Sequence, residues 1–324
     1  MRKQKGIALI TILVMVALAT ILAASIVEHQ TNTRENIDYI KRQNQALLYA
    51  KSAEFFLKQL LIDDAKNAGN VDHLNENWAK PMPIFPIEGG HITGIIEDES
   101  GKFNLNNLLK KDGTINEPAK LWFEQLLVRV GLPAQLSEAV IDWQDENDQP
   151  VGAMGAESAY YLGVNNAALP SNQKFNSVEQ LKQVRGFEAG RYKLIEPYVT
   201  AQPNIETLVN INTASGYLLA SLDEQLNPET IQNELNQRVK NLKYFDSVDA
   251  LWSLDSMKAI DDEHKKKFSS LLGVKSQYFK AKIEVILNGK NQQLVSYLHR
   301  DQQNVYVNSR SLVPFATLMT KVLE

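Results

Sequence analysis

The 324-residue sequence contains no cysteine, and this absence limits the chemistry open to the protein. Disulfide bonds, cysteine-ligated zinc and thiol nucleophiles are all excluded. An exported chain without disulfides needs some other cross-link to hold a large fold together, and a bound metal ion is one option.

Recognisable catalytic motifs are missing as well. The five histidines are scattered without HExxH spacing, and there is neither a G-x-S-x-G nucleophile elbow nor a phosphate-binding glycine loop. The net charge of −4 and the pI of 5.8 argue against bulk binding of nucleic acid. We therefore expect a protein that is not an enzyme and has no nucleic-acid partner.

Charge is missing from one long segment, the 21 residues from Ile7 to Val27. At a helical rise of ~1.5 Å per residue this segment is about 30 Å long, the thickness of a bilayer's hydrocarbon core. The preceding leader, MRKQKG, carries three positive charges, which favour a cytoplasmic N-terminus with the bulk of the chain across the membrane. The sequence predicts a single transmembrane helix here.

Three interpretations of this segment compete. A secretory signal peptide has a shorter apolar stretch, and Ala23-Ala24-Ser25 is only a weak cleavage site. A plain membrane anchor is the second interpretation. The third depends on the junction of Gly6 and Ile7, because glycine followed directly by an apolar helix resembles the processing site of type IV pilins and pseudopilins. This resemblance implies that a prepilin peptidase cuts between Gly6 and Ile7 and methylates the new N-terminus.

Thr11 departs from the pattern of that family. Most members carry glutamate at this position, the fifth of the mature chain, where it pairs with a neighbour's N-terminal amine. A carboxylate in lipid is costly without a partner, and a subunit with Thr11 cannot make the pairing with a subunit above it. Within the family this absence marks the secretion-system subunit at the filament tip.

The apolar helix is expected to continue beyond the membrane. The chain has no glycine or proline from Glu28 until Gly69, and its apolar residues share one helical face. These residues are Ile37, Ile40, Leu47, Ala50, Leu57 and Leu61. We predict one helix of ~90 Å from Ile7 to Ala68. The alternative is a separate surface helix after a break near residues 29–34.

Strand patterns lie on both sides of a mostly helical region. Residues 89–105 predict a strand pair or a strand and a turn, and Tyr278 to Leu287 alternates apolar residues with Lys280, Lys282 and Glu284. The pair Asn288-Gly289 predicts a hairpin turn, followed by strands at 293–300 and 304–307. Between them, helices are predicted over Pro118–Val130 and Pro133–Trp143.

This order predicts an α+β, pilin-like fold with a long N-terminal helix and an antiparallel sheet, split by a large, mostly helical inserted domain. The expected segments are a leader at 1–6, a transmembrane helix at 7–27, a first part of the pilin-like domain at 28–102, the inserted domain at 103–273 and the C-terminal strands at 274–324.

The inserted domain contains a weak internal duplication. Phe175 to Thr200 resembles Phe245 to Val274, since each begins with Phe, a polar residue, Ser, Val and an acidic residue. The turn at residues 184–187, Val-Arg-Gly-Phe, resembles the glycine turn of a helix-hairpin-helix, which holds a DNA phosphate with backbone amides. Because the chain is acidic and carries an export signal, we interpret this turn as helical packing.

Oxygen-bearing side chains gather between Ile141 and Tyr161, a segment without histidine. They are Asp142, Asp145, Asn147, Asp148 and Glu157. A set of oxygen ligands suits calcium, which accepts six to eight of them. We expect Gly152 and Gly155 to let backbone carbonyls turn inward. The spacing is not that of an EF-hand, and a solvated acidic turn is the alternative.

Several motifs together resemble one family along nearly the whole chain. They are the Gly6–Ile7 junction, Thr11, FNLNNLL at 103–109, DWQDENDQP at 142–150 with GAE at 155–157, VNINTAS at 209–215 and SQYF at 276–279. In this order they resemble the minor pseudopilin K family of the type II secretion system. Family members commonly have Asp where this chain has Asn147.

This resemblance implies a bacterial inner-membrane protein, single-pass, with its bulk in the periplasm and structural calcium in the insertion. It also implies a tip complex with minor pseudopilins I and J that starts and caps the pseudopilus, so that folded proteins are exported across the outer membrane. Further partners would be minor pseudopilin H, major pseudopilin G and prepilin peptidase. The alternatives are a minor pilin of a type IV pilus and, in another class, a membrane-anchored hydrolase or nucleic-acid binder.

Overall fold

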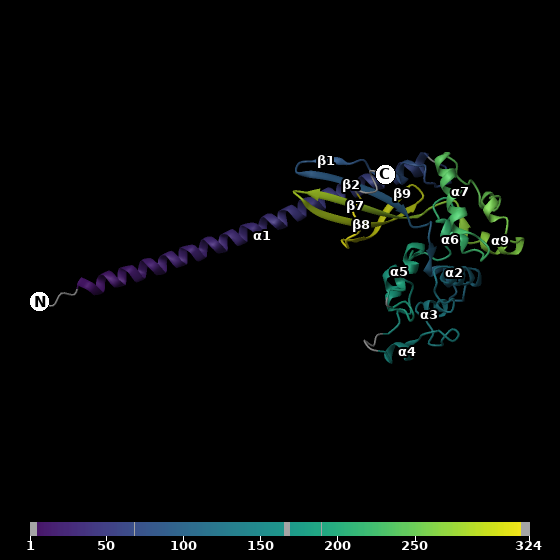
Figure 1. Ribbon diagram of the computed structural model, residues 1–324, viewed down its shortest axis with the longest axis horizontal. Helices are drawn as coiled ribbons and strands as arrows, with labels where there is room; N and C mark the ends of the chain where they lie inside the picture. Colours follow the sequence, from purple (N-terminus) through teal and green to yellow (C-terminus); the bar gives the residue numbers. More distant parts are fainter. Residues whose placement is uncertain (1–4, 68, 165–168, 189, 319–324) are drawn as a thin grey trace.

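A long helix, a five-stranded sheet and a helical region make up the molecule (Figure 1). The structure, a computed structural model, describes residues 5–67, 69–164, 169–188 and 190–318. Helix α1 (Lys5–Asn67) extends away from the sheet at its N-terminal end, and the helical region lies at the opposite end of the molecule.

Helix α1 is one unbroken helix of 63 residues, about 95 Å long, so the alternative with a break at 29–34 is wrong. The predicted last residue, Ala68, lies outside the described residues. Residues 8–27 are exposed on every side, and α1 is long and apolar enough to cross a membrane. Of the predicted apolar face, Ala50, Leu57 and Leu61 are buried against the sheet, whereas Ile37 and Ile40 lie beyond the sheet and are exposed.

The sheet has the strand order β1-β2-β7-β8-β9, with every neighbouring pair antiparallel. Its strands are β1 (Phe85–Ile87), β2 (Gly90–Asp98), β7 (Tyr278–Leu287), β8 (Lys290–Asp301) and β9 (Asn304–Ser311). Strand β2 pairs with β7, and Asp98 lies opposite Phe279. The chain therefore leaves the sheet after β2 and returns to it at the same end. The predicted strands at 278–287, 293–300 and 304–307 and the α+β class are confirmed. Within 89–105 the strand-and-turn alternative is confirmed and the strand pair is wrong, because β2 pairs with β1 and β7.

Strand β7 has the predicted bounds and alternation, with one exception. Phe279, Ala281, Ile283 and Val285 pack in the core beside α1, but Glu284 is also fully buried. The C-terminal segment covers it, because Glu284 accepts hydrogen bonds from the Thr317 hydroxyl and the Leu318 amide, both at 2.9 Å. Burial alone would raise the pKa of Glu284, but these and other hydrogen bonds hold it below its usual value.

The turn between β7 and β8 is the predicted hairpin. Asn288 and Gly289 have φ values of +49° and +72°, the left-handed conformation that a two-residue turn of this kind requires at both positions. Asparagine and glycine adopt this conformation at little cost.

The helical region consists of short elements between β2 and β7. Its α-helices are α2 (Glu117–Arg129), α3 (Leu136–Asp142), α4 (Ser158–Leu162), α5 (Tyr192–Ile195), α6 (Gly216–Ala220), α7 (Pro228–Lys240), α8 (Val248–Trp252) and α9 (Asp262–Ser269). Its strands are β3 (Phe103–Asn104), β4 (Val199–Thr200), β5 (Val209–Asn210) and β6 (Leu272–Gly273). The predicted inserted domain, 103–273, runs from the first residue of β3 to the last residue of β6. The predicted helix at 133–143 begins later, at Leu136.

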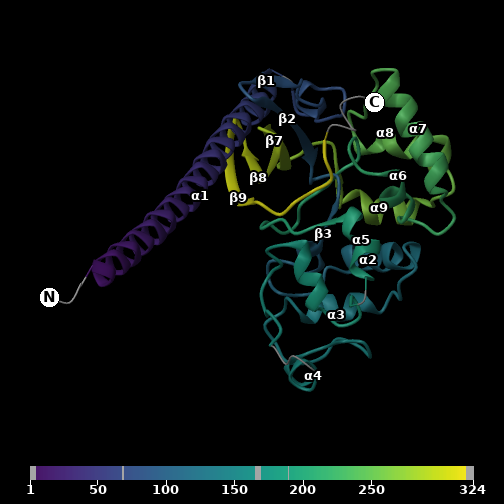
Figure 2. The same ribbon diagram turned by 60° about the vertical axis from the view of Figure 1, so that its left-hand side comes forward.

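The structure supports the internal duplication. In the first unit β3 pairs in parallel with β4, and in the second β5 pairs in parallel with β6. Asn106 binds both backbone groups of Phe175 through its side-chain amide, and Asn212 binds both backbone groups of Phe245 in the same way. Figure 2 shows the first unit, with α2 to α5, beside the second, with α6 to α9. We call them the first lobe (103–200) and the second lobe (209–273); they share one hydrophobic core.

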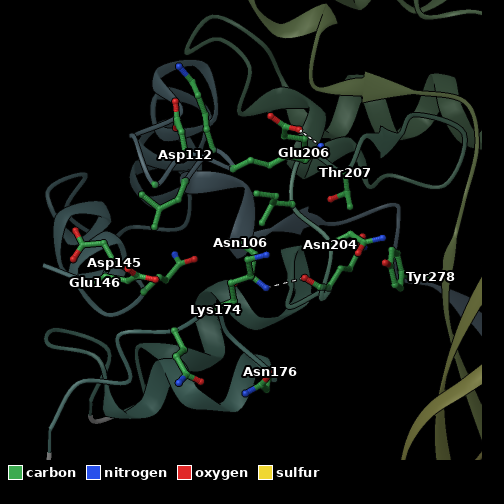
Figure 3. A pocket seen from close by; sticks show the side chains of 18 of the residues that line it. Asn106, Asp112, Asp145, Glu146, Lys174, Asn176, Asn204, Glu206, Thr207 and Tyr278 are labelled. Atoms are coloured by element: carbon green, nitrogen blue, oxygen red, sulfur yellow. Dashed lines mark hydrogen bonds and ion pairs between the residues drawn. The ribbon is translucent and has the colours of Figure 1, made fainter.

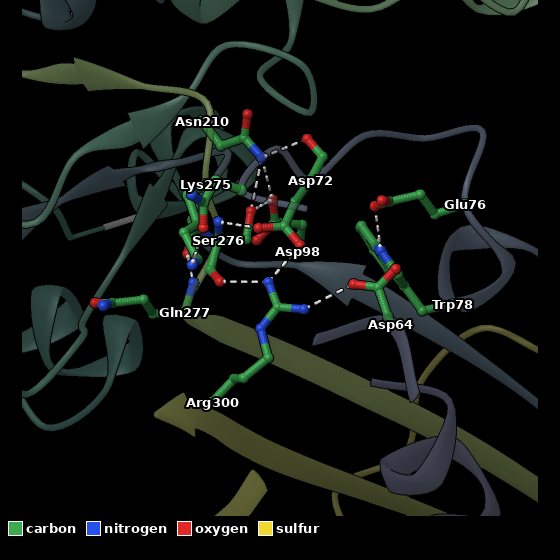
Figure 4. A network of polar contacts seen from close by, with 12 residues as sticks. Asp64, Asp72, Glu76, Trp78, Asp98, Asn210, Lys275, Ser276, Gln277 and Arg300 are labelled. Atoms are coloured by element: carbon green, nitrogen blue, oxygen red, sulfur yellow. Dashed lines mark hydrogen bonds and ion pairs between the residues drawn. The ribbon is translucent and has the colours of Figure 1, made fainter. Parts of the chain in front are cut away.

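A buried polar network lies where the insertion joins the sheet (Figure 4). Arg300 of β8 donates to Asp64 of α1 at 2.8 Å and to the Ser276 carbonyl at 2.8 Å, and it also pairs with Asp72. Ser276 and Asp98 are linked through the Ser276 hydroxyl. The network thus connects α1, β2 and β8 to the segment by which the chain re-enters the sheet.

Acidic side chains outnumber basic ones in this network. Burial raises the pKa of Asp64 to about 7, with a further contribution from the negative charge of Glu76, while Arg300 opposes the shift. Burial likewise raises the pKa of Asp98 to about 6. Arg300 pairs with Asp64 and Asp72 and therefore makes the burial of these two carboxylates compatible with neutral pH.

Replacing Arg300 with methionine should destabilise the protein by about 3–5 kcal/mol at pH 8, because buried carboxylates would lose their cationic partner. Urea unfolding of the full chain in detergent would measure the change. The matched control is Lys258→Met, which removes an exposed ion pair with Asp255 and should leave the midpoint unchanged. The loss in free energy of unfolding caused by Arg300→Met should be smaller at pH 5.5, where Asp64 takes up a proton. An equal loss at pH 8 and pH 5.5 would contradict this account.

Candidate metal site and family

Three of the predicted metal ligands meet beside α3. Asp142 is the last residue of α3, Asp145 follows one turn later, and Glu157 directly precedes α4. One carboxylate oxygen from each of the three lies within 4.8 Å of the others, and all three residues are buried. Residues 146–156 form a loop that leaves α3 and returns to it, which brings Glu157 back to the two aspartates.

Backbone amides from this loop hold Asp142. Its Oδ1 accepts the Val151 N–H at 3.0 Å, and its Oδ2 accepts the Ala156 N–H at 2.7 Å. A Cβ at Gly155 would lie 2.5 Å from Asp142 Oδ2, so only glycine permits this approach. The Gly155 carbonyl accepts from the Arg185 guanidinium at 2.9 Å.

Three other carboxylate oxygens of the cluster lack partners. Among the described residues, neither oxygen of Glu157 nor Oδ1 of Asp145 has a hydrogen-bond partner, although all three atoms are shielded from solvent. Among the described residues, the salt bridges involve none of these three acids. Buried carboxylates in this arrangement require either protons or a cation between them. The donor set therefore fits a hard cation such as calcium.

The electrostatics agree with this fit. Burial raises the pKa of Glu157 to about 7, and the charges of Asp142 and Asp145 raise it further in the same direction. Burial raises the pKa of Asp142 to about 6, against the two amide hydrogen bonds that lower it, and also raises the pKa of Asp145. Protons and a cation compete for these groups, so cation binding should strengthen as the pH rises through 6 to 7.

The two other predicted ligands lie outside this cluster. Asn147 is exposed and its Oδ1 accepts the Gln149 N–H at 2.8 Å, which closes a local turn. Asp148 is also exposed and accepts the Ser158 N–H at 3.2 Å. Asp148 is nevertheless close enough for its charge to raise the pKa of Glu157.

Glu138 has a role that the sequence analysis missed. It lies one helical turn before Asp142 on α3, and its Oε2 accepts the Met154 N–H of the loop at 2.7 Å. Gly152, with φ +67°, packs against this carboxylate so closely that a Cβ would lie 2.4 Å from Glu138 Oε1. The i, i+4 spacing of Glu138 and Asp142 is a signal that could have identified it.

A second acidic group, Asp64, Asp72 and Glu76, also has oxygens within 4.8 Å of one another. It differs from the first group because Arg300 already supplies a positive charge there. This group is therefore part of the network at the junction with the sheet.

The predicted processing site lies at the N-terminal end of α1. The helix begins at Lys5 and continues through Gly6 and Ile7, while residues 1–4 of the leader lie outside the described residues. Thr11 donates its hydroxyl to the Ala8 carbonyl at 2.9 Å, so its polar group is satisfied within its own helix.

Comparisons with known proteins agree along the chain. Residues 101–204 and 209–275 match two family models, each described as type II secretion system protein K. The chain is 34% identical to type II secretion system protein K of Pseudomonas aeruginosa over 92% of this chain and 90% of that protein. It is 30% identical to the protein of the same name from Aeromonas hydrophila, over 96% of this chain and 97% of that protein. The chain belongs to the type II secretion system protein K family.

A solved structure supports the same assignment. A chain of the GspK-GspI-GspJ complex from enterotoxigenic Escherichia coli matches with a TM-score of 0.76 and 26% identity, over 88% of this chain and all of that chain. The protein is therefore a minor pseudopilin of the type II secretion system, and α1 is compatible with single-pass membrane anchoring. The two family models coincide closely with the first and second lobes.

Replacing Glu157 with glutamine should have opposite effects with and without calcium. In calcium, the variant should melt below the wild type, because a charged ligand is lost. In chelator it should melt at or above the wild type, because a buried carboxylate without a partner has been neutralised. Calcium at about 100 times its dissociation constant should stabilise the wild type by ~3 kcal/mol.

The matched control is Asp148→Asn, in the same loop but outside the cluster; it should change the calcium-dependent melting shift much less than Glu157→Gln. Identical melting of the wild type in calcium and in chelator would contradict the metal site.

Proposed function

We propose that this minor pseudopilin acts at the tip of the pseudopilus, where it starts filament assembly and supports the export of folded proteins across the outer membrane. The observation that carries this proposal is the position of the two lobes. They lie at the end of the molecule farthest from the N-terminal end of α1, and the chain enters and leaves them at one end of the sheet (Figure 1).

This placement suits a terminal subunit. The two lobes, with the linker between them, comprise residues 103–273. They would obstruct the docking of a further subunit above this one. Thr11 supports the same position, because its hydroxyl bonds to its own helix and it has no carboxylate for the amine of a subunit above.

We propose minor pseudopilins I and J as direct partners. The matched E. coli chain comes from a complex with GspI and GspJ, and it resembles this chain over nearly its full length. Minor pseudopilin H and the major pseudopilin G would follow below this complex in the filament. The exposed apolar side chains of α1, including Leu48 and Phe55, would be available for contact with the helices of these subunits.

For maturation, we propose that prepilin peptidase cuts between Gly6 and Ile7 and methylates Ile7. The basic leader favours a cytoplasmic N-terminus, so the sheet and the lobes would lie in the periplasm of a bacterium, with α1 anchored in the inner membrane.

We propose calcium as a structural ion held by Asp142, Asp145 and Glu157, with water or backbone oxygens completing its coordination. The ion would fix residues 146–156 against α3, in a chain that has no disulfide to do so. We propose no enzymatic activity for the protein.

A nucleic-acid function has less support than assembly. In the turn at 184–187, the Gly186 amide that a DNA phosphate would need donates instead to the Glu188 carboxylate at 3.0 Å. The alternative of a type IV pilus subunit is disfavoured because both family models and the curated relatives belong to the type II secretion system.

Mass spectrometry of the protein, co-purified with I and J from membranes of secreting cells, tests maturation and partnership together. The expected N-terminus is methylated Ile7, in a complex that contains both partners. Gly6→Val should block the cut and prevent assembly, while Gly163→Val, at an exposed glycine with a φ of −87° far from the junction, should be processed normally. Finding intact Met1 in assembled, functional protein would contradict the proposal.

A further inference from the structure

A large cavity lies between the first lobe, the linker to the second lobe and the end of the sheet (Figure 3). Its walls come from residues 109–113, 144–147 and 172–176 of the first lobe, from the linker 202–208, and from 275–278 at the start of β7. Its volume is about 1390 Å³, which exceeds the range of about 300–1,000 Å³ typical of small-molecule pockets. The size favours a segment of a polymer.

The lining is unusually rich in side-chain amides. Nine of the lining residues are Asn or Gln, and an amide side chain offers both donors and an acceptor, as a peptide group does. The one aromatic lining residue, Tyr278, is buried and presents no free ring face for a sugar or a base to stack on. The lining charges balance, with four lysines against four acidic residues, so the cavity does not select a polyanion.

Several lining oxygens lack a donor. Gln144 Oε1, Asn172 Oδ1 and Gln202 Oε1 have no hydrogen-bond partner and are shielded from solvent. The orientations of Gln144 and Gln202 are fixed, because their amide nitrogens donate to the carbonyls of Leu105 at 3.2 Å and Glu99 at 2.9 Å. The N–H groups of a ligand could donate to these fixed oxygen acceptors.

One rim of the cavity is closed by a weak contact. Lys111 of the first lobe and Glu206 of the linker form an ion pair at 3.1 Å, and both side chains are exposed. An exposed pair of this kind contributes little to stability, so a ligand could displace it at small cost. Asn147 and Asp145, the latter a member of the candidate metal site, also line the cavity.

We propose that this cavity binds an extended polypeptide segment through its main chain. The inference rests on the proposed function, since the segment would come from an exported protein. The exposed amide side chains of the lining, such as Asn176 and Gln277, bind the main-chain N–H and C=O groups, and recognition therefore tolerates many sequences. The candidate metal site holds one wall of the cavity in place.

The absence of cysteine allows a direct test in the full-length protein. Gln173→Cys and Gln277→Cys place a single thiol on exposed lining residues, and Asn233→Cys places one on the exposed side of α7, outside the cavity. Each variant is labelled in secreting cells with a maleimide photo-crosslinker, and the adducts are identified by mass spectrometry. One set of cells lacks the exported proteins, and another lacks pseudopilins I and J.

Both cavity positions should give at least tenfold more adduct than the α7 control, with a defined contiguous segment of one polypeptide. The adduct should disappear in the cells that lack the exported proteins. An adduct that persists there and consists of pseudopilin I or J would overturn the assignment to an exported protein. A second change, Asn176→Trp, fills the cavity and should reduce the adduct at Gln277→Cys about tenfold while co-purification with I and J persists.

Adduct at the level of the α7 control, or adduct to glycan, would overturn the proposal. Co-purification with I and J, measured on the same samples, separates this failure from a failure of the proposed function. A complex that persists without cavity adduct overturns the cavity proposal alone, whereas loss of the complex from the wild type overturns the proposed function.

Discussion

Strand β2 ends at Asp98, directly beside Phe279 of β7, and this pairing determines how the rest of the molecule is arranged. The two strands are neighbours in the sheet although about 180 residues separate them in the chain. The residues between these two strands must therefore leave the sheet and return to it at one end. Helix α1 packs against one face of the same sheet. Arg300 stabilises this point, because it connects α1, the Asp72 loop and the returning segment through buried charge. The position of the lobes at the far end of the molecule follows from this single constraint.

Within the insertion, duplication explains how a long segment folds around one core. Each lobe begins with a short strand and ends with its parallel partner, and in each an asparagine fixes the backbone of a buried phenylalanine, Phe175 or Phe245. The loop at 146–156 packs Val151, Met154 and Ala156 against the core of the lobes. The carboxylates at its two ends, Asp142, Asp145 and Glu157, are buried, and among the described residues no cationic side chain pairs with them. The conformation of the loop should therefore depend on a cation or on protons at these carboxylates.

Sequence patterns predicted those parts of the fold that depend on interactions between residues close together in the chain. The length of α1, the bounds of β7 and the turn at Asn288-Gly289 each follow from periodicity or from the conformational preference of a few residues. The burial of Glu284 could not be predicted, because the C-terminal segment that covers it lies more than 30 residues away in the chain. Long-range contacts of that kind leave no periodic signal.

The candidate site was predictable in the same partial way. The sequence identified Asp142, Asp145 and Glu157 by composition, but composition could not separate them from Asn147 and Asp148, whose oxygens are used by nearby backbone amides. The network around Arg300 had no sequence signal, because its members come from five distant segments. The cavity between the first lobe and the sheet likewise depends on tertiary packing.

The central claim is that the protein occupies the end of the pseudopilus, with its lobes outward. Electron microscopy of isolated pseudopili, with a gold label on a single cysteine at Asn233 of the second lobe, tests this claim most directly. The account predicts label at one end of each filament and none along its length. Label distributed at intervals along the filament would contradict it.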